Sequence, residues 1–212
     1  MSMRRITTRV VIMAKAPQAG QVKTRLVPAL GAQGAADLAL RMLLRTVNTA
    51  LAARGTDIES VTVCASPDPQ DPAWAGVTLP GAVSWTAQGK GDLGQRMART
   101  ANYLLSKGER VLLIGTDLPG LTCEVLQNAA RALSKYEACV LPTFDGGYGL
   151  LGLRSPQPVF DDMPWSTPEV FALTQERLRP APVWIGPMLQ DIDEPQDLVH
   201  WPEPIVPSGD AR

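Results

Sequence analysis

The stretch Arg110-Val-Leu-Leu-Ile-Gly-Thr-Asp-Leu-Pro-Gly-Leu121 decides the fold class. Its apolar run, residues 111–114, is typical of a strand buried on both faces, and it breaks off at Gly115-Thr116-Asp117 before a Pro-Gly turn. In open α/β sheets, ligands bind at the carboxyl edge that such strands reach. Asp117 can bind a ligand there, or it can simply form the turn. Thr122 is the better cap for the helix that follows, so Asp117 has no evident structural task.

Strand-like and helix-like segments alternate along the rest of the chain. Strands are predicted at 10–14, 58–65, 83–86, 111–114, 138–142, 148–153 and 182–185, and helices at 32–54, 92–105, 123–133, 167–178 and 194–200. This alternation predicts an α/β fold with a mostly parallel central sheet and helices on both faces. We expect a single domain over residues 1–201 and an irregular tail over residues 202–212.

The composition narrows the class of protein. Apolar residues make up 45% of the 212 residues and charged residues 19%, which excludes wholesale disorder. The formal net charge of −1 indicates neither a nucleic-acid partner nor an anionic membrane surface. No apolar run approaches the roughly 20 residues of a membrane span, and the run after the basic start is too short for a secretory signal. With three cysteines and no C-x-x-C pair, the sequence predicts a cytoplasmic protein with reduced thiols.

The loop after the first predicted strand carries three cations, Lys15, Lys23 and Arg25. Exposed lysines are usually only solvated, but this loop follows a strand whose carboxyl end reaches the same edge as Asp117. Arg25 offers a planar fork that suits phosphate oxygens. Opposite charges at one edge therefore favour a metal and phosphate complex.

Two better-known phosphate motifs do not fit. The segment Gly20-Gln-Val-Lys-Thr24 lacks the glycine that a P-loop places directly before its lysine. The segment Gly89-Lys-Gly-Asp-Leu-Gly94 matches G-x-G-x-x-G, but it follows the third predicted strand instead of the first. A dinucleotide site is therefore not favoured.

Further carboxylates follow later segments. Asp145 lies in the glycine-rich turn Phe144-Asp-Gly-Gly-Tyr148, which is either an ordinary Asp-Gly turn or a place where a ligand approaches the backbone closely. The segment Asp191-Ile-Asp193 supplies two more, of which Asp193 can also cap the last helix. Because magnesium usually takes one or two protein carboxylates and completes its shell with water and phosphates, Asp117 and Asp193 would suffice.

As a set, these segments resemble the family named radical-SAM/selenodomain-associated transferase 1, of the GT-A nucleotide-diphospho-sugar transferase fold. The matching segments are residues 13–26, 88–97, 115–119, 145–148, 165–167 and 191–198, in the family's order. The chain resembles more distantly the guanylyltransferases that activate 2-phospho-lactate or molybdopterin. The aspartate motif here is Thr116-Asp117-Leu118, without the second aspartate of a full D-x-D.

The resemblance implies a role for each matching residue. Asp117 and Asp193 would bind Mg²⁺ or Mn²⁺, and Lys23 and Arg25 would hold the phosphates. Asp145 would orient an acceptor hydroxyl or act as its base. The remaining nucleotide contacts implied are Lys15, Gly20, Gln88, Gly91, Asp92, Arg96 and Thr116, and the remaining acceptor contacts are Gly146, Gly147, Tyr148, Trp165, Ser166 and Thr167.

We therefore predict a metal-dependent transferase that uses a nucleotide-activated donor and a small-molecule acceptor. Two chemistries fit. Glycosyl transfer from a nucleotide sugar is favoured by the family resemblance, whereas nucleotidyl transfer from a nucleoside triphosphate, with release of pyrophosphate, is favoured by the basic loop. A nucleotide-binding regulator without turnover is a third hypothesis. Retention of both Asp117 and Asp193 with the basic pair argues against it.

Overall fold

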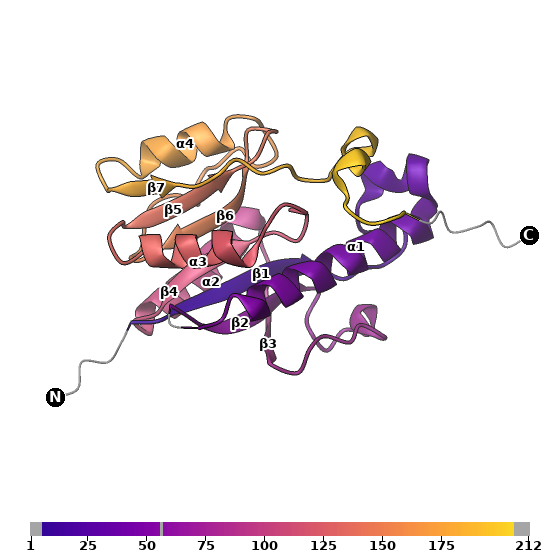
Figure 1. The fold of residues 1–212 in the computed structure, drawn as a ribbon, viewed down its shortest axis with the longest axis horizontal. Helices are drawn as coiled ribbons and strands as arrows, with labels where there is room; N and C mark the ends of the chain where they lie inside the picture. Colours follow the sequence, from indigo (N-terminus) through magenta and orange to yellow (C-terminus); the bar gives the residue numbers. More distant parts are fainter. Residues whose placement is uncertain (1–5, 56, 206–212) are drawn as a thin grey trace, which may run out of the picture.

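The fold is built on one seven-stranded sheet (Figure 1). It is known from a computed structural model that describes residues 6–55 and 57–205. The strands are β1 (Thr8–Lys15), β2 (Ile58–Ser66), β3 (Val83–Ala87), β4 (Arg110–Ile114), β5 (Ala138–Pro142), β6 (Tyr148–Leu153) and β7 (Val183–Ile185). Their order across the sheet is β3-β2-β1-β4-β6-β5-β7. All neighbours pair in parallel except β6, which is antiparallel to both β4 and β5.

Helices cover both faces of the sheet, as the sequence predicted. The α-helices are α1 (Val27–Ala52), α2 (Leu93–Ser106), α3 (Cys123–Ala132) and α4 (Val170–Arg177), and the short 3-10 helices are η1 (Thr24–Leu26), η2 (Pro72–Trp74) and η3 (Pro195–His200). Side chains of α1 and α3 pack on one face in a core that includes Ile12 and Leu112. Side chains of α2 and α4 pack on the other face against Val11 and Leu113. The alternation of neighbouring residues of β1 and β4 between the two cores is the period of a strand buried on both sides.

Two helices differ in extent from the prediction. Helix α1 begins at Val27 instead of residue 32, and it bends at Gly31, whose φ of 72° is one that glycine adopts without strain. Helix α4 begins at Val170 because the preceding turn holds Ser166 at φ 66°, which is incompatible with a helix. The predicted cap of α3 is confirmed: the Thr122 hydroxyl accepts a hydrogen bond from the Val125 amide at 3.3 Å.

A third, smaller core lies at one end of the molecule. It joins η1 and the beginning of α1 to the C-terminal segment, through Leu26, Met42, Ile192 and Trp201. In Figure 1 this segment runs from β7 across the molecule to reach η1 and α1. The small core therefore anchors the predicted phosphate loop against residues far away in the sequence.

Several sequence-based expectations concern regions that the structure describes only in part. Residues 202–205 form neither helix nor strand, as expected for the tail, and residues 206–212 lie outside the described residues. The single domain over residues 1–201 stays a prediction.

Cys64, Cys123 and Cys139 are free thiols, as expected. None of the described helices combines the length and apolar character needed to cross a membrane.

We predict that the sheet tolerates no side chain at Gly152 of β6. A Cβ atom there would overlap the Cys139 sulfur and lie 2.6 Å from Leu112 Cδ2. Gly152→Ala should lower the free energy of unfolding by about 1–3 kcal/mol, measured by denaturant titration. Gly81→Ala is the control, because a Cβ atom on Gly81 would meet no other atom within 4 Å, and it should change stability by less than about 0.5 kcal/mol. Equal stability of the two variants would contradict this packing.

Candidate functional site

A cavity of about 540 Å³ opens at the carboxyl ends of β1, β4 and β5. Its lining combines the loop after β1, the turn after β4, the turn between β5 and β6, the loop before α4 and the segment before η3. The chain leaves β1 toward β2 on one side, whereas β4 lies on the other side of β1. This is the topological switch point of the sheet, where open α/β proteins bind their ligands.

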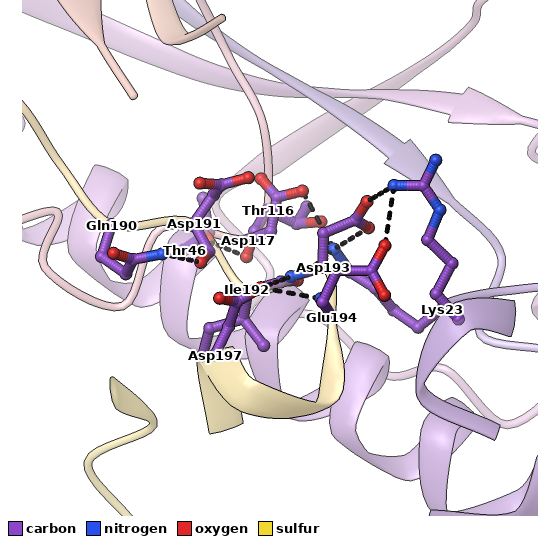
Figure 2. Close-up of polar contacts among 11 residues, drawn as sticks. Lys23, Thr46, Thr116, Asp117, Gln190, Asp191, Ile192, Asp193, Glu194 and Asp197 are labelled. Atoms are coloured by element: carbon purple, nitrogen blue, oxygen red, sulfur yellow. Dashed lines mark hydrogen bonds and ion pairs between the residues drawn. The ribbon is translucent and has the colours of Figure 1, made fainter. Parts of the chain in front are cut away.

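Lys23 lines the cavity and is the residue that joins its charged segments (Figure 2). Its ammonium donates hydrogen bonds to Asp117 Oδ2 at 3.0 Å and to the Ile192 carbonyl at 2.6 Å. It also lies 3.5 Å from Asp193 Oδ1. Only 10% of the Lys23 side chain is exposed, and its backbone is left-handed at φ 46°. Such a conformation costs about 1–2 kcal/mol for a residue with a side chain, which the buried polar contacts offset.

The two carboxylates keep Lys23 charged despite its burial. Burial alone would lower the pKa of the lysine, but the charges and hydrogen bonds of Asp117 and Asp193 outweigh it, so that the pKa is raised. All three donors of the ammonium thus face acceptors of the protein itself. The Lys23 ammonium therefore mainly holds these protein acceptors together, and it has few N–H donors left for a phosphate.

The other two predicted cations have different surroundings. Arg25 donates to Asp193 Oδ2 at 2.6 Å and lies 3.3 Å from Glu194 Oε1, yet 59% of its side chain remains exposed. Lys15 donates to the Gln21 carbonyl at 2.6 Å, within its own loop. Both line the cavity, whereas Gly20 does not; Gly20 instead supports the turn with a φ of 73°. Arg25 is thus the cation best placed to meet an anion that enters from solvent.

Asp117 owes its position to the glycine two residues before it. A Cβ atom on Gly115 would lie 2.8 Å from Asp117 Oδ1, so the absence of a side chain at Gly115 leaves room for the carboxylate in this position. The Thr116 carbonyl accepts from the Thr46 hydroxyl of α1 at 3.2 Å, and the Asp117 carbonyl accepts from the Ile192 amide at 3.0 Å. The turn after β4 is therefore fixed from both sides, and both Thr116 and Asp117 line the cavity.

A second group of carboxylates includes one residue that the sequence analysis did not assign. Asp191 is half-buried, and its pKa is raised to about 6, first by burial and then by the negative charge of Asp145, with a smaller effect of Asp117. Asp145 Oδ1 accepts from the Thr143 hydroxyl at 2.6 Å and from the Gly147 amide at 2.9 Å. Asp191 was overlooked because Asp191 and Asp193 are equivalent by spacing, and only their contacts distinguish them.

These contacts separate Asp193 from Asp191 as candidate metal ligands. Asp193, the predicted second ligand, already contacts Lys23 and Arg25, and its charge is balanced. Asp191 instead faces other carboxylates, an arrangement that favours a divalent cation with oxygen ligands. Within residues 6–55 and 57–205, no cluster of three or more His, Cys, Asp or Glu side chains forms a complete metal site. Any metal would therefore need further oxygens from its ligand.

The segment after β3 does not reach the cavity in the way the resemblance implies. Gln88 is buried and donates to the carbonyls of Ala14 and Cys64, and its own oxygen accepts from Arg96 at 2.8 Å. Asp92 caps α2 in a capping box with Gln95. The four predicted nucleotide contacts Gln88, Gly91, Asp92 and Arg96 are absent from the cavity lining, and the same region contributes Leu93 and Met97 instead.

The predicted acceptor loop does line the cavity. Gly147, Tyr148, Trp165, Ser166 and Thr167 all contribute to its wall. Gly146 does not, but it has a structural role: its φ is 87°, and a Cβ atom there would overlap the Pro168 backbone. The turn after β5 and the loop before α4 are thereby packed together, which Asp145 and Trp165 need in order to face one cavity.

With this geometry, the chain can be compared with known proteins. Residues 46–167 match the family described as "Uncharacterized protein conserved in bacteria (DUF2064)". The chain belongs to this family. A crystal structure from Desulfovibrio desulfuricans G20, described as a "putative nucleotide-diphospho-sugar transferase", is 32% identical with a TM-score of 0.80, and the match covers 92% of this chain and 85% of that one. No curated protein matches the sequence.

Two more distant structures share the fold alone. One is described as a "Putative Glucose-1-Phosphate Thymidylyltransferase" from Bacillus anthracis, at 12% identity and a TM-score of 0.58, covering 92% of this chain and 94% of that one. The other is Rv0371c from Mycobacterium tuberculosis H37Rv in complex with manganese, at 15% identity and a TM-score of 0.54, covering 93% and 98%. The α/β fold of the nucleotide-diphospho-sugar transferase type, predicted from the sequence, is confirmed.

We predict that Lys23 stabilises the whole protein more than Arg25 does. Lys23→Met would leave Asp117, Asp193 and the Ile192 carbonyl without their buried partner, and should lower the free energy of unfolding by about 3–5 kcal/mol. Arg25→Met removes a largely exposed ion pair and should cost at most about 1 kcal/mol. Denaturant titration at pH 7 measures both, and equal losses would refute the structural role of Lys23.

The loss of stability that Lys23→Met causes should itself depend on pH. Because the folded pKa of Lys23 lies above its usual value, its contribution is complete at neutral pH and is lost as the pH rises through the folded pKa. The difference in stability between wild type and Lys23→Met should therefore shrink only in the alkaline range. A difference that already disappears near pH 8 would contradict the raised pKa.

Proposed function

We propose that this protein is a transferase that uses a nucleotide-activated donor together with a divalent metal ion. The observation that carries the proposal is the arrangement at the switch point, where Asp117, Asp145 and Asp191 lie around one cavity opposite Lys15 and Arg25. The negative charges of Asp145 and Asp117 add to burial in raising the pKa of Asp191, which favours a bound cation there, and exposed cations beside these carboxylates favour phosphate oxygens. The relative described as a nucleotide-diphospho-sugar transferase supports the same class of ligand.

Asp117 and Asp191 are the proposed metal ligands. Asp117 was expected from the sequence, and Asp191 replaces Asp193 because Asp193 is already paired with Lys23 and Arg25. Both proposed ligands bind through carboxylate oxygens, which suit Mg²⁺ and Mn²⁺. The distantly similar Rv0371c structure contains manganese, one of these two ions. When bound, the metal would neutralise the phosphates of the donor and the charge that develops on its leaving group.

The cations have separate proposed tasks. Arg25 and Lys15 would bind the donor phosphates, because both line the cavity and Arg25 is largely exposed. Lys23 would act as a positioning residue that fixes the Asp117 carboxylate at 3.0 Å. Thr116 lines the cavity and would contact the nucleotide directly. The other predicted nucleotide contacts would act indirectly, by fixing the backbone around the cavity: Gly20, Gln88, Gly91, Asp92 and Arg96.

Asp145 is the proposed base toward the acceptor. Its Oδ1 is held by Thr143 and by the Gly147 amide, so its Oδ2 is the oxygen available to a ligand. In glycosyl transfer, the acceptor oxygen would bond to the anomeric carbon while Asp145 takes the hydroxyl proton. The bond between that carbon and the phosphate oxygen would break, and the nucleoside diphosphate would leave with the electron pair.

Within this class, we favour glycosyl transfer over nucleotidyl transfer. The argument for nucleotidyl transfer is the basic loop, but its most buried cation, Lys23, is engaged by Asp117, Asp193 and the Ile192 carbonyl, which leaves Lys15 and Arg25 for the donor phosphates. The resemblance of the sequence to the radical-SAM/selenodomain-associated transferase 1 family supports the same proposal. A regulator without turnover is less favoured, because Asp145 Oδ2 can accept a proton from an acceptor hydroxyl, and a protein that only binds a nucleotide does not need such a base.

We predict that nucleotide binding depends on the metal through Asp117. With Mn²⁺ or Mg²⁺, at about 100 times its dissociation constant, a nucleotide sugar or nucleoside triphosphate should raise the melting temperature by about 5–10 °C. Asp117→Asn should abolish the part of this shift that requires metal, because an amide is a weaker ligand than a carboxylate. Differential scanning fluorimetry over a panel of nucleotides measures the shift.

Asp161→Asn is the matched control for this experiment. Asp161 is exposed and lies outside the cavity lining, so its variant should keep the full metal-dependent shift. A shift that survives Asp117→Asn with its metal dependence unchanged would remove Asp117 from the metal site. If no nucleotide stabilises the wild type, the proposed donor class is wrong.

Product analysis separates the two chemistries. We expect a nucleoside diphosphate to accumulate when nucleotide sugars, a divalent metal and a panel of hydroxyl acceptors are incubated with the protein and resolved by ion-exchange chromatography. Pyrophosphate from a nucleoside triphosphate would instead identify a nucleotidyltransferase. If neither product forms although nucleotides bind, the protein is a regulator.

A further inference from the structure

The cavity has an apolar side that the proposed metal and phosphate chemistry leaves unused. This apolar wall consists of Met13, Leu93, Met97, Tyr148, Trp165 and Val170. It is continuous with the core between the sheet, α2 and α4, because Met97 belongs to that core and Met13, Tyr148 and Trp165 pack against it. The carboxylates and cations that line the same cavity come from other segments: the loop after β1, the turns after β4 and β5, and the segment before η3.

Both aromatic residues of the wall direct their polar atoms away from the cavity. The Tyr148 hydroxyl is buried beside Thr174 of α4, and burial raises the pKa of this phenol. Trp165 turns its indole nitrogen toward the backbone of α2, where a Cβ atom on Gly94 would lie 2.7 Å from Nε1. The rings meet edge to face, with centroids 6.4 Å apart. A ligand on this wall therefore meets mainly ring surface, because the Tyr148 hydroxyl is buried and the Trp165 indole nitrogen lies beside Gly94.

Few polar groups stand next to the wall. The Thr167 hydroxyl donates to the Pro164 carbonyl at 2.8 Å, within its own loop. Ser166 is the other polar residue that this loop contributes to the cavity lining. Asp145 also lines the cavity, with Oδ2 available. A polyhydroxylated ligand would leave several hydroxyls without partners on this wall, at a cost of about 1–3 kcal/mol for each buried one.

We infer that the acceptor has a planar or bulky apolar body with a single nucleophilic hydroxyl, and that it is not a polyol such as a sugar. The body packs on the apolar wall, and its hydroxyl reaches Asp145. This inference rests on the proposed transferase function. It assigns Trp165, Tyr148 and Leu93 as the residues that select the acceptor class.

Two neutral probes of different class test the wall. 2-Naphthol has an aromatic body and one hydroxyl, whereas methyl α-D-glucopyranoside carries several hydroxyls on a ring of similar width. Isothermal titration calorimetry should give 2-naphthol an affinity at least about tenfold higher than that of the glucoside. Because both probes are uncharged, the phosphate-binding side contributes little to either.

Variants locate the bound probe. Trp165→Ala should weaken 2-naphthol about tenfold through the loss of ring contact. Leu93→Ser provides a second variant that leaves the fold intact, because Leu93 is 36% exposed at the beginning of α2, and it should weaken 2-naphthol about threefold. Trp85→Ala is the control: it removes an exposed tryptophan of β3 that lies outside this cavity, and it should leave the affinity unchanged.

Each contrary outcome has a defined meaning. Equal or tighter binding of the glucoside overturns the inference, and so does 2-naphthol binding that is insensitive to both Trp165→Ala and Leu93→Ser. If these variants weaken a metal-bound nucleotide instead of 2-naphthol, the wall holds the base of the donor and the inference fails. If the wild type binds no nucleotide at all but the naphthol results hold, the proposed function fails and the class of ligand on the wall stands.

Discussion

The arrangement of the site depends on the hydrogen bonds and the ion pair that the buried Lys23 ammonium forms. The ammonium joins three segments that are far apart in sequence: its own loop after β1, Asp117 at the end of β4, and Ile192 with Asp193 in the C-terminal segment. A buried charge of this kind is tolerated only when its donors are satisfied, so the three segments must come together for any one of them to be stable. The small core around Leu26 and Trp201 joins two of these segments, the one after β1 and the C-terminal one.

These contacts also divide the charges of the cavity into two groups. Lys23 and Arg25 balance Asp193, so that this carboxylate belongs to the framework. Asp191 has no such ion pair among the described residues, and its pKa is raised first by burial and then by the negative charge of Asp145. Lys23 therefore fixes the geometry of the site, whereas Asp191 is a half-buried carboxylate whose charged form is disfavoured by burial and by the charge of Asp145.

The apolar wall of the cavity carries no charged side chain. The side chains of α2 and of the loop before α4 extend the core out to the cavity surface, and the polar atoms of Tyr148 and Trp165 face the protein. Charged and apolar side chains therefore line one cavity, to which Asp145 also contributes. Such a lining favours a ligand that has both characters, because burying a charge against apolar side chains is costly.

The sequence by itself determined the α/β class, nearly every strand and helix, and the delivery of Asp117 to the ligand-binding edge, because strand period, caps and glycine turns are local properties. Only the tertiary structure decided that Lys23 is engaged by the protein, that Asp193 is paired while Asp191 is not, and that Gln88 serves the backbone of β1 and β2. These roles depend on contacts between residues up to 169 positions apart. Spacing along the chain cannot distinguish two aspartates two residues apart, because what separates them is which charges the fold brings to each.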